Sequence, residues 1–280
     1  MNRYIITDST AYLDQATLKE KGIIVIPLNV HIKDQSYQEG IDISNSDYYH
    51  ILKSEPIFPT TSQPASGDFL QVFDKMQVGD EALIITLSAK LSGTMQSAQI
   101  AREMSNYSDK IFIHDSKSAA AGMAFQVLKA HDLLKAGWDM ASVVRELEGM
   151  RERVRIFFMV SDLEYLARGG RIGKAAKYLG NILQLKPILW VDDGEINLFD
   201  KVRSRQKAIK SLISQVEEAQ GSLEAVTVIG IDAQEEARNL QETLQERFTI
   251  PVGISEAGPV IGSHIGSGGL GVAFVKSKID

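Results

Sequence analysis

The stretch ALIITLSAKLSGTMQSAQIAREM, residues 82–104, sets the fold of this chain of 280 residues. Its first part, Ala82–Leu87, is a short aliphatic run typical of a buried strand. Ser88–Thr94 is a turn rich in small hydroxyl side chains, and Gly93–Met104 has the pattern of a helix. A strand, a polar turn and a helix in this order predict a mostly parallel α/β sheet, in which ligands bind beyond the carboxyl ends of the strands.

Similar units flank this stretch. Short aliphatic runs predict further strands at Tyr4–Thr7, Ile23–Pro27 and Ile111–His114. Helical patterns predict helices at Ser66–Met76, Ser118–Lys135 and Trp138–Val154. We therefore expect residues 1–155 to form one domain, with a mostly parallel sheet and flanking helices.

The second half of the chain has a different pattern. Asp192-Asp193-Gly194 separates two apolar runs, Ile188–Val191 and Glu195–Phe199, and so predicts a hairpin. Further strands are expected at Ile156–Val160, Ala225–Ile231 and Val272–Val275, and helices at Ser204–Gln220 and Gln234–Phe248. We expect residues 156–280 to form a mixed α/β domain that ends in a Gly-rich loop.

Composition excludes several classes of function. A net charge of −6 argues against a nucleic-acid partner, and so against a regulator that binds DNA. Without cysteine, disulfides, thiolate chemistry and cysteine-based zinc sites are excluded, and the five histidines lack metal-ligand spacing, so no metal is expected. No apolar run reaches the roughly 18 residues of a membrane span, and a cytoplasmic protein is expected.

Two turns carry hydroxyl groups beside a helix start. One is TTSQPAS, residues 60–66, and the other is the Ser88–Thr94 turn. Free N–H groups at a helix start, together with hydroxyl groups, bind anions. Because no acid–base pair accompanies these turns, they favour holding a carboxylate over cutting a bond.

Two Gly-rich segments resemble nucleotide motifs. GSGGLG, residues 266–271, runs into an expected strand rather than a helix, so it does not predict a dinucleotide site. GGRIGK, residues 169–174, lacks the spacing of a phosphate loop; it is either a joint between two helices or an anion- or partner-binding segment. His264 lies among glycines, in an expected loop, where it can meet a ligand.

A hydrolase or phosphotransferase that uses Ser92 or His264 is the alternative from another class. Asp8 could orient the histidine of such an enzyme. The sequence has neither a G-x-S-x-G elbow nor a P-loop, which weighs against this alternative.

Taken in order, the motifs resemble those of the DegV family. They are Asp8-Ser9-Thr10, Thr61-Ser62-Gln63-Pro64, Leu91–Ala98, His114-Asp115-Ser116, Leu163–Leu166, Gly169–Ile172, Lys186–Leu189, Lys201-Val202-Arg203 and Gly258–Gly262. The resemblance implies a two-domain α/β protein that binds a long-chain fatty acid, has no other cofactor and is not itself an enzyme. A separate ATP-binding fatty acid kinase subunit would phosphorylate the bound acid.

The resemblance also implies roles for single residues. Thr61 and Ser92 would hold the carboxylate, with Ser62 and Thr94 nearby, and Arg203 and His264 would serve phosphotransfer or the partner. Two positions depart from the family pattern: Ala65 and Ser66 follow Pro64, and Ser267 replaces a proline. The first is expected to alter the start of the helix, and the second to loosen the loop of His264.

Overall fold

The computed structural model describes residues 1–280 except 56, 162, 179–184 and 279–280. A four-stranded parallel sheet has the order β2-β1-β6-β7. Its strands are β1 (Arg3–Asp8), β2 (Ile23–Ile26), β6 (Glu81–Thr86) and β7 (Ile111–Asp115). The associated helices are α1 (Gln15–Lys21), α3 (Ser66–Phe73), α4 (Thr94–Met104), α5 (Ala120–Lys135) and α6 (Met140–Arg151). The expected parallel sheet is confirmed.

A six-stranded mixed sheet has the order β10-β9-β8-β13-β11-β12, in which only β11 and β12 are parallel. Its strands are β8 (Val154–Met159), β9 (Lys186–Asp192), β10 (Glu195–Val202), β11 (Leu223–Ile231), β12 (Val252–Glu256) and β13 (Gly269–Lys276). The associated helices are α7 (Glu164–Arg168), α8 (Arg205–Glu217), α9 (Gln234–Gln245) and α10 (Pro259–Ile265). The expected hairpin is β9–β10, and the expected domain junction at residues 155 and 156 falls inside β8.

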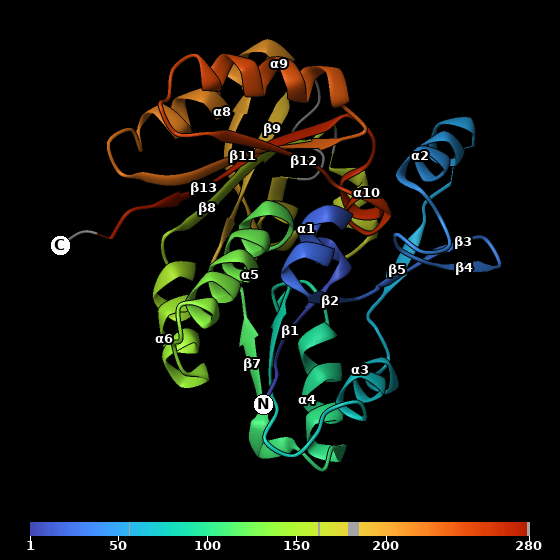
Figure 1. Cartoon of the computed structure of the whole chain (residues 1–280). Helices are drawn as coiled ribbons and strands as arrows, with labels where there is room; N and C mark the ends of the chain where they lie inside the picture. Colours follow the sequence, from blue (N-terminus) through green and yellow to red (C-terminus); the bar gives the residue numbers. More distant parts are fainter. Residues whose placement is uncertain (56, 162, 179–184, 279–280) are drawn as a thin grey trace.

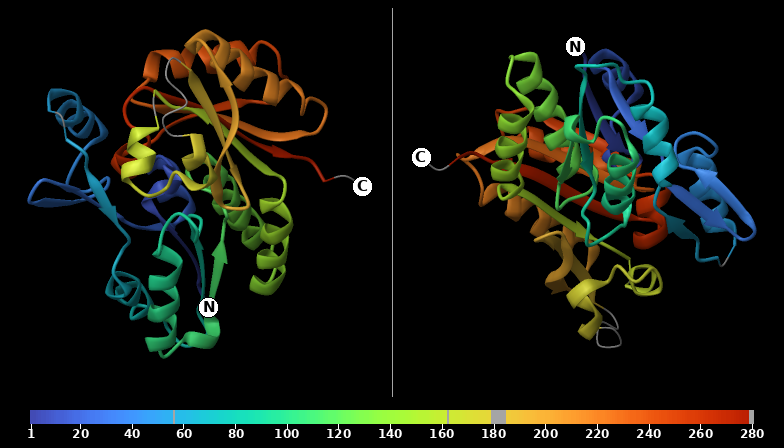
Figure 2. Two further views of the ribbon diagram at one scale, coloured as in Figure 1. Left: turned by 180° about the vertical axis from the view of Figure 1, so that it is seen from behind. Right: turned by 90° about the horizontal axis from the view of Figure 1, so that it is seen from below.

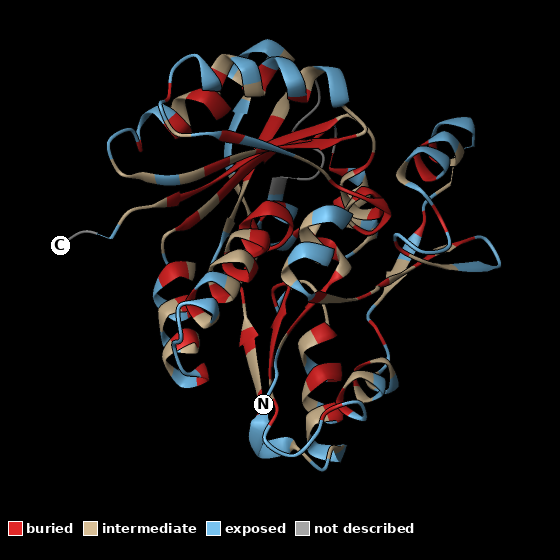
Figure 3. Cartoon of the chain, viewed as in Figure 1, coloured by how far each residue is buried: buried red, intermediate tan, exposed pale blue. Residues whose placement is uncertain are grey.

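The two sheets and their helices form five layers (Figure 1). α3 and α4 cover one face of the parallel sheet, where Phe69 and Ala98 pack on Ile84. α5 lies between the two sheets and contacts strands of both. α8 and α9 cover the outer face of the mixed sheet, and Figure 3 shows their outward sides exposed. Because one apolar core runs from the parallel sheet through α5 to the mixed sheet, the halves are packed as one body.

A third sheet was not expected from the sequence. β3 (Asn29–Ile32) pairs antiparallel with β4 (Gln35–Gln38) and β5 (Thr60–Ser62), and α2 (Asn45–Ser54) follows β4. This arm, residues 29–62, projects from the side of the molecule in both views of Figure 2. In β3, buried Val30 and Ile32 alternate with half-buried Asn29 and His31, which is the pattern of a strand with one buried face.

The remaining elements among the described residues are three 3₁₀ helices. They are η1 (Ser9–Ala11), η2 (Ser108–Lys110) and η3 (Gly173–Tyr178). Within the part of the chain that the structure describes, every helix is too short or too polar to cross a membrane.

Candidate functional site

The arm strand β5 supplies two of the predicted hydroxyl groups. Thr61 Oγ1 lies 2.8 Å from Nε2 of His264, and Ser62 Oγ lies 2.9 Å from Nε2 of His31. Consecutive strand side chains point to opposite faces, so Thr61 meets α10 while Ser62 meets β3. Both hydroxyl groups are therefore held in place by a histidine.

The turn after β6 supplies the third hydroxyl group. Ser92 Oγ lies 2.9 Å from Oγ1 of the buried Thr94, and the Thr94 N–H donates to Ser92 Oγ. The buried carboxylate of Asp8 fixes the start of this turn by accepting the N–H of Leu87 at 2.7 Å. Thr94 begins α4 and orients Ser92. It does not line the cavity that Ser92 and Thr61 share, which is described below.

Gly93 lets the two hydroxyl turns meet. A Cβ atom at Gly93 would lie 2.5 Å from the side-chain amide of Gln63. Such a distance is shorter than any ordinary contact, so only glycine allows Gln63 to pack there. The start of α3 is also intact despite Ala65, because Asp68 accepts the Ala65 N–H at 2.8 Å.

His264 lies on a helix, so the expectation of a loop was wrong. Pro259 occupies the first turn of α10, and Gly266, with φ of 76°, ends it; this combination is a helix signal that the surrounding glycines obscured. The turn after α10 is also not loosened, because the hydroxyl of Ser267 donates to Asp232.

The ring of His264 is largely shielded from water. Burial, with the nearby Arg171 guanidinium, lowers the pKa of His264 to about 4, so the ring is neutral at physiological pH. Its Nδ1 atom is buried and makes no hydrogen bond to any described residue. A Cβ atom on Gly169 would lie 2.2 Å from Nδ1, so Gly169 leaves the space that the ring occupies.

These groups surround one cavity, which we call the hydroxyl cavity. Its polar side is formed by Thr61, Ser62, Ser92, His264 and Arg171, and the remaining residues are Leu28, Gln63, Leu87, Leu91, Leu166, Ile196, Val260, Ile261 and Ile265. The structure thus brings together four of the predicted site residues, which come from three separate parts of the chain.

Arg171 is a site residue that the sequence only hinted at. Its Nε donates to the Leu91 carbonyl at 3.0 Å, and a second nitrogen donates to the Gly169 carbonyl at 2.6 Å. These two bonds hold a permanent positive charge at the hydroxyl cavity. The GGRIGK segment is therefore a joint between α7 and η3 that also brings a cation to the cavity.

A second cavity lies beside the first. It is lined by Leu91, Ala119, Ala120, Ile156, Phe158, Val191, Ile196, Ile229, Ile231, Ile261, Ile265 and Gly271. We call it the apolar cavity because no side chain in this lining carries a polar group. Leu91, Ile196, Ile261 and Ile265 line both cavities. A polar anion site thus adjoins a hydrocarbon-lined space between the two sheets.

Residues 3–277 match a family model described as "Uncharacterised protein, DegV family". The chain belongs to the DegV family. A DegV domain-containing protein of Halalkalibacterium halodurans is 39% identical over 280 residues, which are 98% of each chain.

Two solved DegV structures are closely similar in fold. One, described as showing fatty acid binding of a DegV family protein from Thermus thermophilus, has a TM-score of 0.90 and 31% identity and covers 99% of this chain and 100% of its own. The other is DegV from Bacillus subtilis, described as a fatty acid binding protein, with a TM-score of 0.88, 34% identity and the same coverage.

In this DegV-family chain, Arg203 lies away from the hydroxyl cavity. It is exposed and directly follows β10, whereas Ile196, near the other end of β10, lines the cavity. Seven strand residues span about 23 Å. Its neighbour Arg205 has a structural task, since its guanidinium pairs with both carboxylate oxygens of Glu236 at 2.6 and 2.5 Å. The structure therefore does not bring Arg203 and His264 together.

The contacts of this DegV-family chain do not form a hydrolase triad. Among the described residues, Ser92 bonds Thr94, His264 bonds Thr61, and Asp8 bonds Thr10 and the Leu87 N–H. A triad needs the serine bonded to the histidine and the histidine to the acid. The hydroxyl groups of Thr61, Ser62 and Ser92 instead line a shared space.

Proposed function

We propose that this protein binds a long-chain fatty acid, with the carboxylate in the hydroxyl cavity and the acyl chain in the apolar cavity. The observation that carries the proposal is that the two cavities are adjacent and share the lining residues Leu91, Ile196, Ile261 and Ile265. A polar pocket beside a hydrocarbon-lined space matches the two ends of a fatty acid. The similar proteins from Thermus thermophilus and Bacillus subtilis are both described as binding fatty acids, which supports the same assignment.

The energetics favour the acyl chain as the source of affinity. Burying each CH₂ group contributes about 0.8 kcal/mol. The two cavities measure about 80 and 60 Å³, so a long chain also needs the aliphatic side chains around them to change rotamer. The carboxylate must keep hydrogen bonds when it leaves water, and Thr61, Ser62 and Ser92 supply the donors.

The bound acid is then presented to a separate kinase subunit. Hydroxyl groups, neutral His264 and the fixed charge of Arg171 hold the carboxylate without a bidentate arginine clamp, which leaves its oxygens able to accept phosphate. The kinase supplies ATP, and this chain supplies the positioned carboxylate. Exposed Arg203 is a contact for the kinase, outside the cavity.

The first experiment tests binding. The double variant Thr61→Ala/Ser92→Ala should bind palmitate more weakly, because each lost hydrogen bond to a charged group costs about 1.5–3 kcal/mol. The control, Ser36→Ala/Thr249→Ala, removes two exposed hydroxyl groups outside both cavities. Titration calorimetry and native mass spectrometry measure both. Equal affinity in the two double variants would contradict the placement of the carboxylate.

The second experiment tests presentation. With the cognate kinase subunit and ATP, Arg203→Ala should form acyl phosphate slowly while binding palmitate normally. Arg238→Ala, which removes an exposed arginine of α9, should behave like the wild type in both assays. Normal turnover by Arg203→Ala would remove Arg203 from the kinase contact, and no turnover by the wild type would refute presentation altogether.

A further inference from the structure

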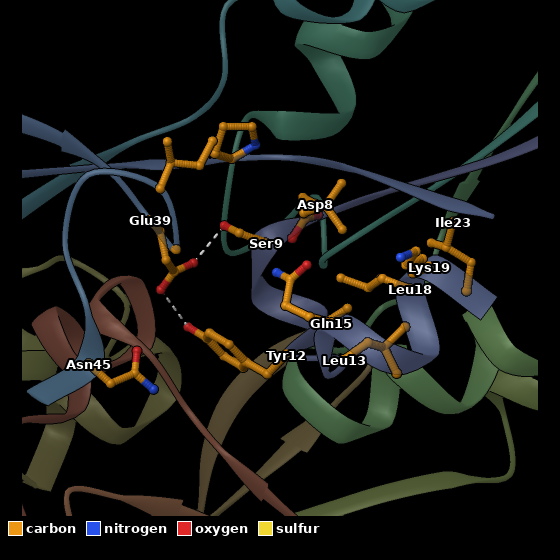
Figure 4. Close-up of a pocket in the computed structure, with 15 residues that line it drawn as sticks. Asp8, Ser9, Tyr12, Leu13, Gln15, Leu18, Lys19, Ile23, Glu39 and Asn45 are labelled. Atoms are coloured by element: carbon orange, nitrogen blue, oxygen red, sulfur yellow. Dashed lines mark hydrogen bonds between the residues drawn. The ribbon is translucent and has the colours of Figure 1, made fainter. Parts of the chain in front are cut away.

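A separate cleft lies beside α1. Its volume is about 570 Å³, within the 300–1,000 Å³ typical of small-molecule sites. It is bounded by α1 and β2 and by the segment from Glu39 to Asn45 between β4 and α2 (Figure 4). None of its lining residues lines the hydroxyl or apolar cavity, so the proposed fatty acid site leaves this cleft without a role.

The cleft combines an aliphatic surface with unpartnered polar groups. The aliphatic part consists of Leu13, Leu18, Ile23, Val25, Pro27 and Ile41. Gln15, Leu18 and Lys19 are spaced i, i+3 and i+4 on α1, so they share the helix face that lines the cleft. No described residue hydrogen-bonds or pairs with the side chains of Gln15, Lys19 or Asn45, and these groups can therefore bind a ligand.

Charge distinguishes the two ends of the cleft. Lys19 and Ile23 lie at one end, and Glu39 and Asn45 lie at the other (Figure 4). The Glu39 carboxylate is already engaged, because it accepts hydrogen bonds from Ser9, Tyr12 and the Val260 N–H at 2.5, 3.0 and 2.7 Å. An anionic group is attracted to the Lys19 end, whereas the engaged Glu39 carboxyl group offers it no free hydrogen-bond donor.

We propose that this cleft is a second ligand site, which binds a small amphipathic anion. The acidic head group lies at Lys19, and Gln15 donates an additional hydrogen bond to it. The apolar body of the ligand packs on Leu13 and Leu18, which are half-buried, and on Ile23, which is buried. This site is distinct from the fatty acid site, and its occupancy does not require an acyl chain in the apolar cavity.

The test uses 8-anilinonaphthalene-1-sulfonate, an amphipathic anion with a fluorescence signal. The protein is first saturated with palmitate and freed of excess, so that the probe cannot enter the hydroxyl cavity, and palmitate retention is measured by mass. Wild-type protein should bind one probe molecule saturably. The same probe titration is also run on protein without fatty acid, and the cleft variants show whether the probe binds in the cleft. Failure to retain palmitate would therefore count against the proposed function and not against the second site.

Two substitutions in the cleft should weaken probe binding at least tenfold. Lys19→Glu reverses the charge that attracts the head group, and Ile41→Asp places a charge at the apolar rim, where Ile41 is 66% exposed. Lys19→Arg should keep the affinity. The matched controls are Lys75→Glu and Val78→Asp, which make the same changes at exposed positions outside the cleft. Absence of saturable binding, or equal weakening by cleft and control variants, would overturn the proposal.

Discussion

His264 Nε2 lies 2.8 Å from Thr61 Oγ1, although 203 positions separate the two residues in the sequence. Thr61 belongs to the arm, residues 29–62, and His264 to α10. Two tyrosines of α2 reinforce this contact: Tyr48 bonds Ser263 at 2.9 Å, and Tyr49 donates to the Ala257 carbonyl at 2.8 Å. The hydroxyl cavity therefore forms only where the arm packs on α10.

We predict that His264→Ala weakens fatty acid binding. The family resemblance gave His264 a role in phosphotransfer or partner binding, but the structure puts the ring against Thr61 in the cavity wall. Loss of a hydrogen-bonded group beside a charged ligand costs about 1.5–3 kcal/mol, roughly a ten- to hundredfold loss of affinity. Calorimetry with palmitate measures it, and His50→Ala, on the exposed side of α2, is the control. Unchanged affinity would return His264 to a role in phosphotransfer only.

Gly169→Ala should also weaken binding, by displacing the His264 ring. The new Cβ atom would lie 2.2 Å from Nδ1 and 3.1 Å from the Tyr165 carbonyl. Gly149→Ala is the matched control, because Gly149 lies inside α6 with nothing within 4 Å of its Cβ position. There, alanine should stabilise the fold by about 0.5–1 kcal/mol. Equal palmitate affinity in both variants would show that the ring position does not matter.

Ala119→Leu should reduce the length of acyl chain that the protein accepts. Ala119 lines the apolar cavity and is 7% exposed, so a larger side chain fills space that the acyl chain needs. We expect palmitate to lose more affinity than a shorter acid such as laurate. Ala141→Leu, on the exposed face of α6, changes neither. Parallel losses for both acids would place the acyl chain elsewhere.

Glu39 gives the free energy of unfolding a pH dependence of definite sign. Burial raises the pKa of Glu39 from 4.5 to about 7, so folding takes up a proton between these values. Its stabilising contribution is complete at low pH and is lost as the pH rises through about 7. Glu39→Gln cannot titrate, so its unfolding free energy should decline less than that of the wild type from about pH 5 to about pH 7.

Urea unfolding at several pH values measures this difference. One proton corresponds to a slope of at most about 1.4 kcal/mol per pH unit. Glu103→Gln, at an exposed position of α4, should keep the wild-type slope. A parallel pH profile for Glu39→Gln and wild type would be incompatible with a buried, titrating Glu39.

His264 should contribute a slope of the opposite sign. Its pKa falls from 6.5 to about 4 on folding, so the stabilisation by the neutral ring is lost as the pH falls from about 6.5 towards 4. In His264→Gln, unfolding free energy should therefore decrease less on acidification than in the wild type. The same urea series tests this, and a steeper acid loss in the variant would contradict it.

The sequence predicted the central elements because their signals are local. Ala82–Leu87 and Gly93–Met104 carry their strand and helix patterns within a few residues, and both appear in the structure as β6 and α4. The arm was missed because its strands are short, and half-polar Asn29–Ile32 is stabilised by pairing with distant Thr60–Ser62. The sequence singled out the segment of Arg171 but not its place at the cavity, because that place depends on a hydrogen bond to the Leu91 carbonyl, 80 residues away.

The placement of β13 sets an order on biosynthesis. β13 lies inside the mixed sheet, between β8 and β11, and residues 160–268 separate it from β8. A ribosome adds about 5–20 residues per second, so β8 emerges seconds before the strand that covers its edge. During that interval the edge of β8 that later pairs with β13 has unpaired backbone N–H and C=O groups, while β9 can already pair with the other edge. Until β13 is made, the strand that carries Ile156 and Phe158 of the apolar cavity therefore has an open edge at which another strand can pair.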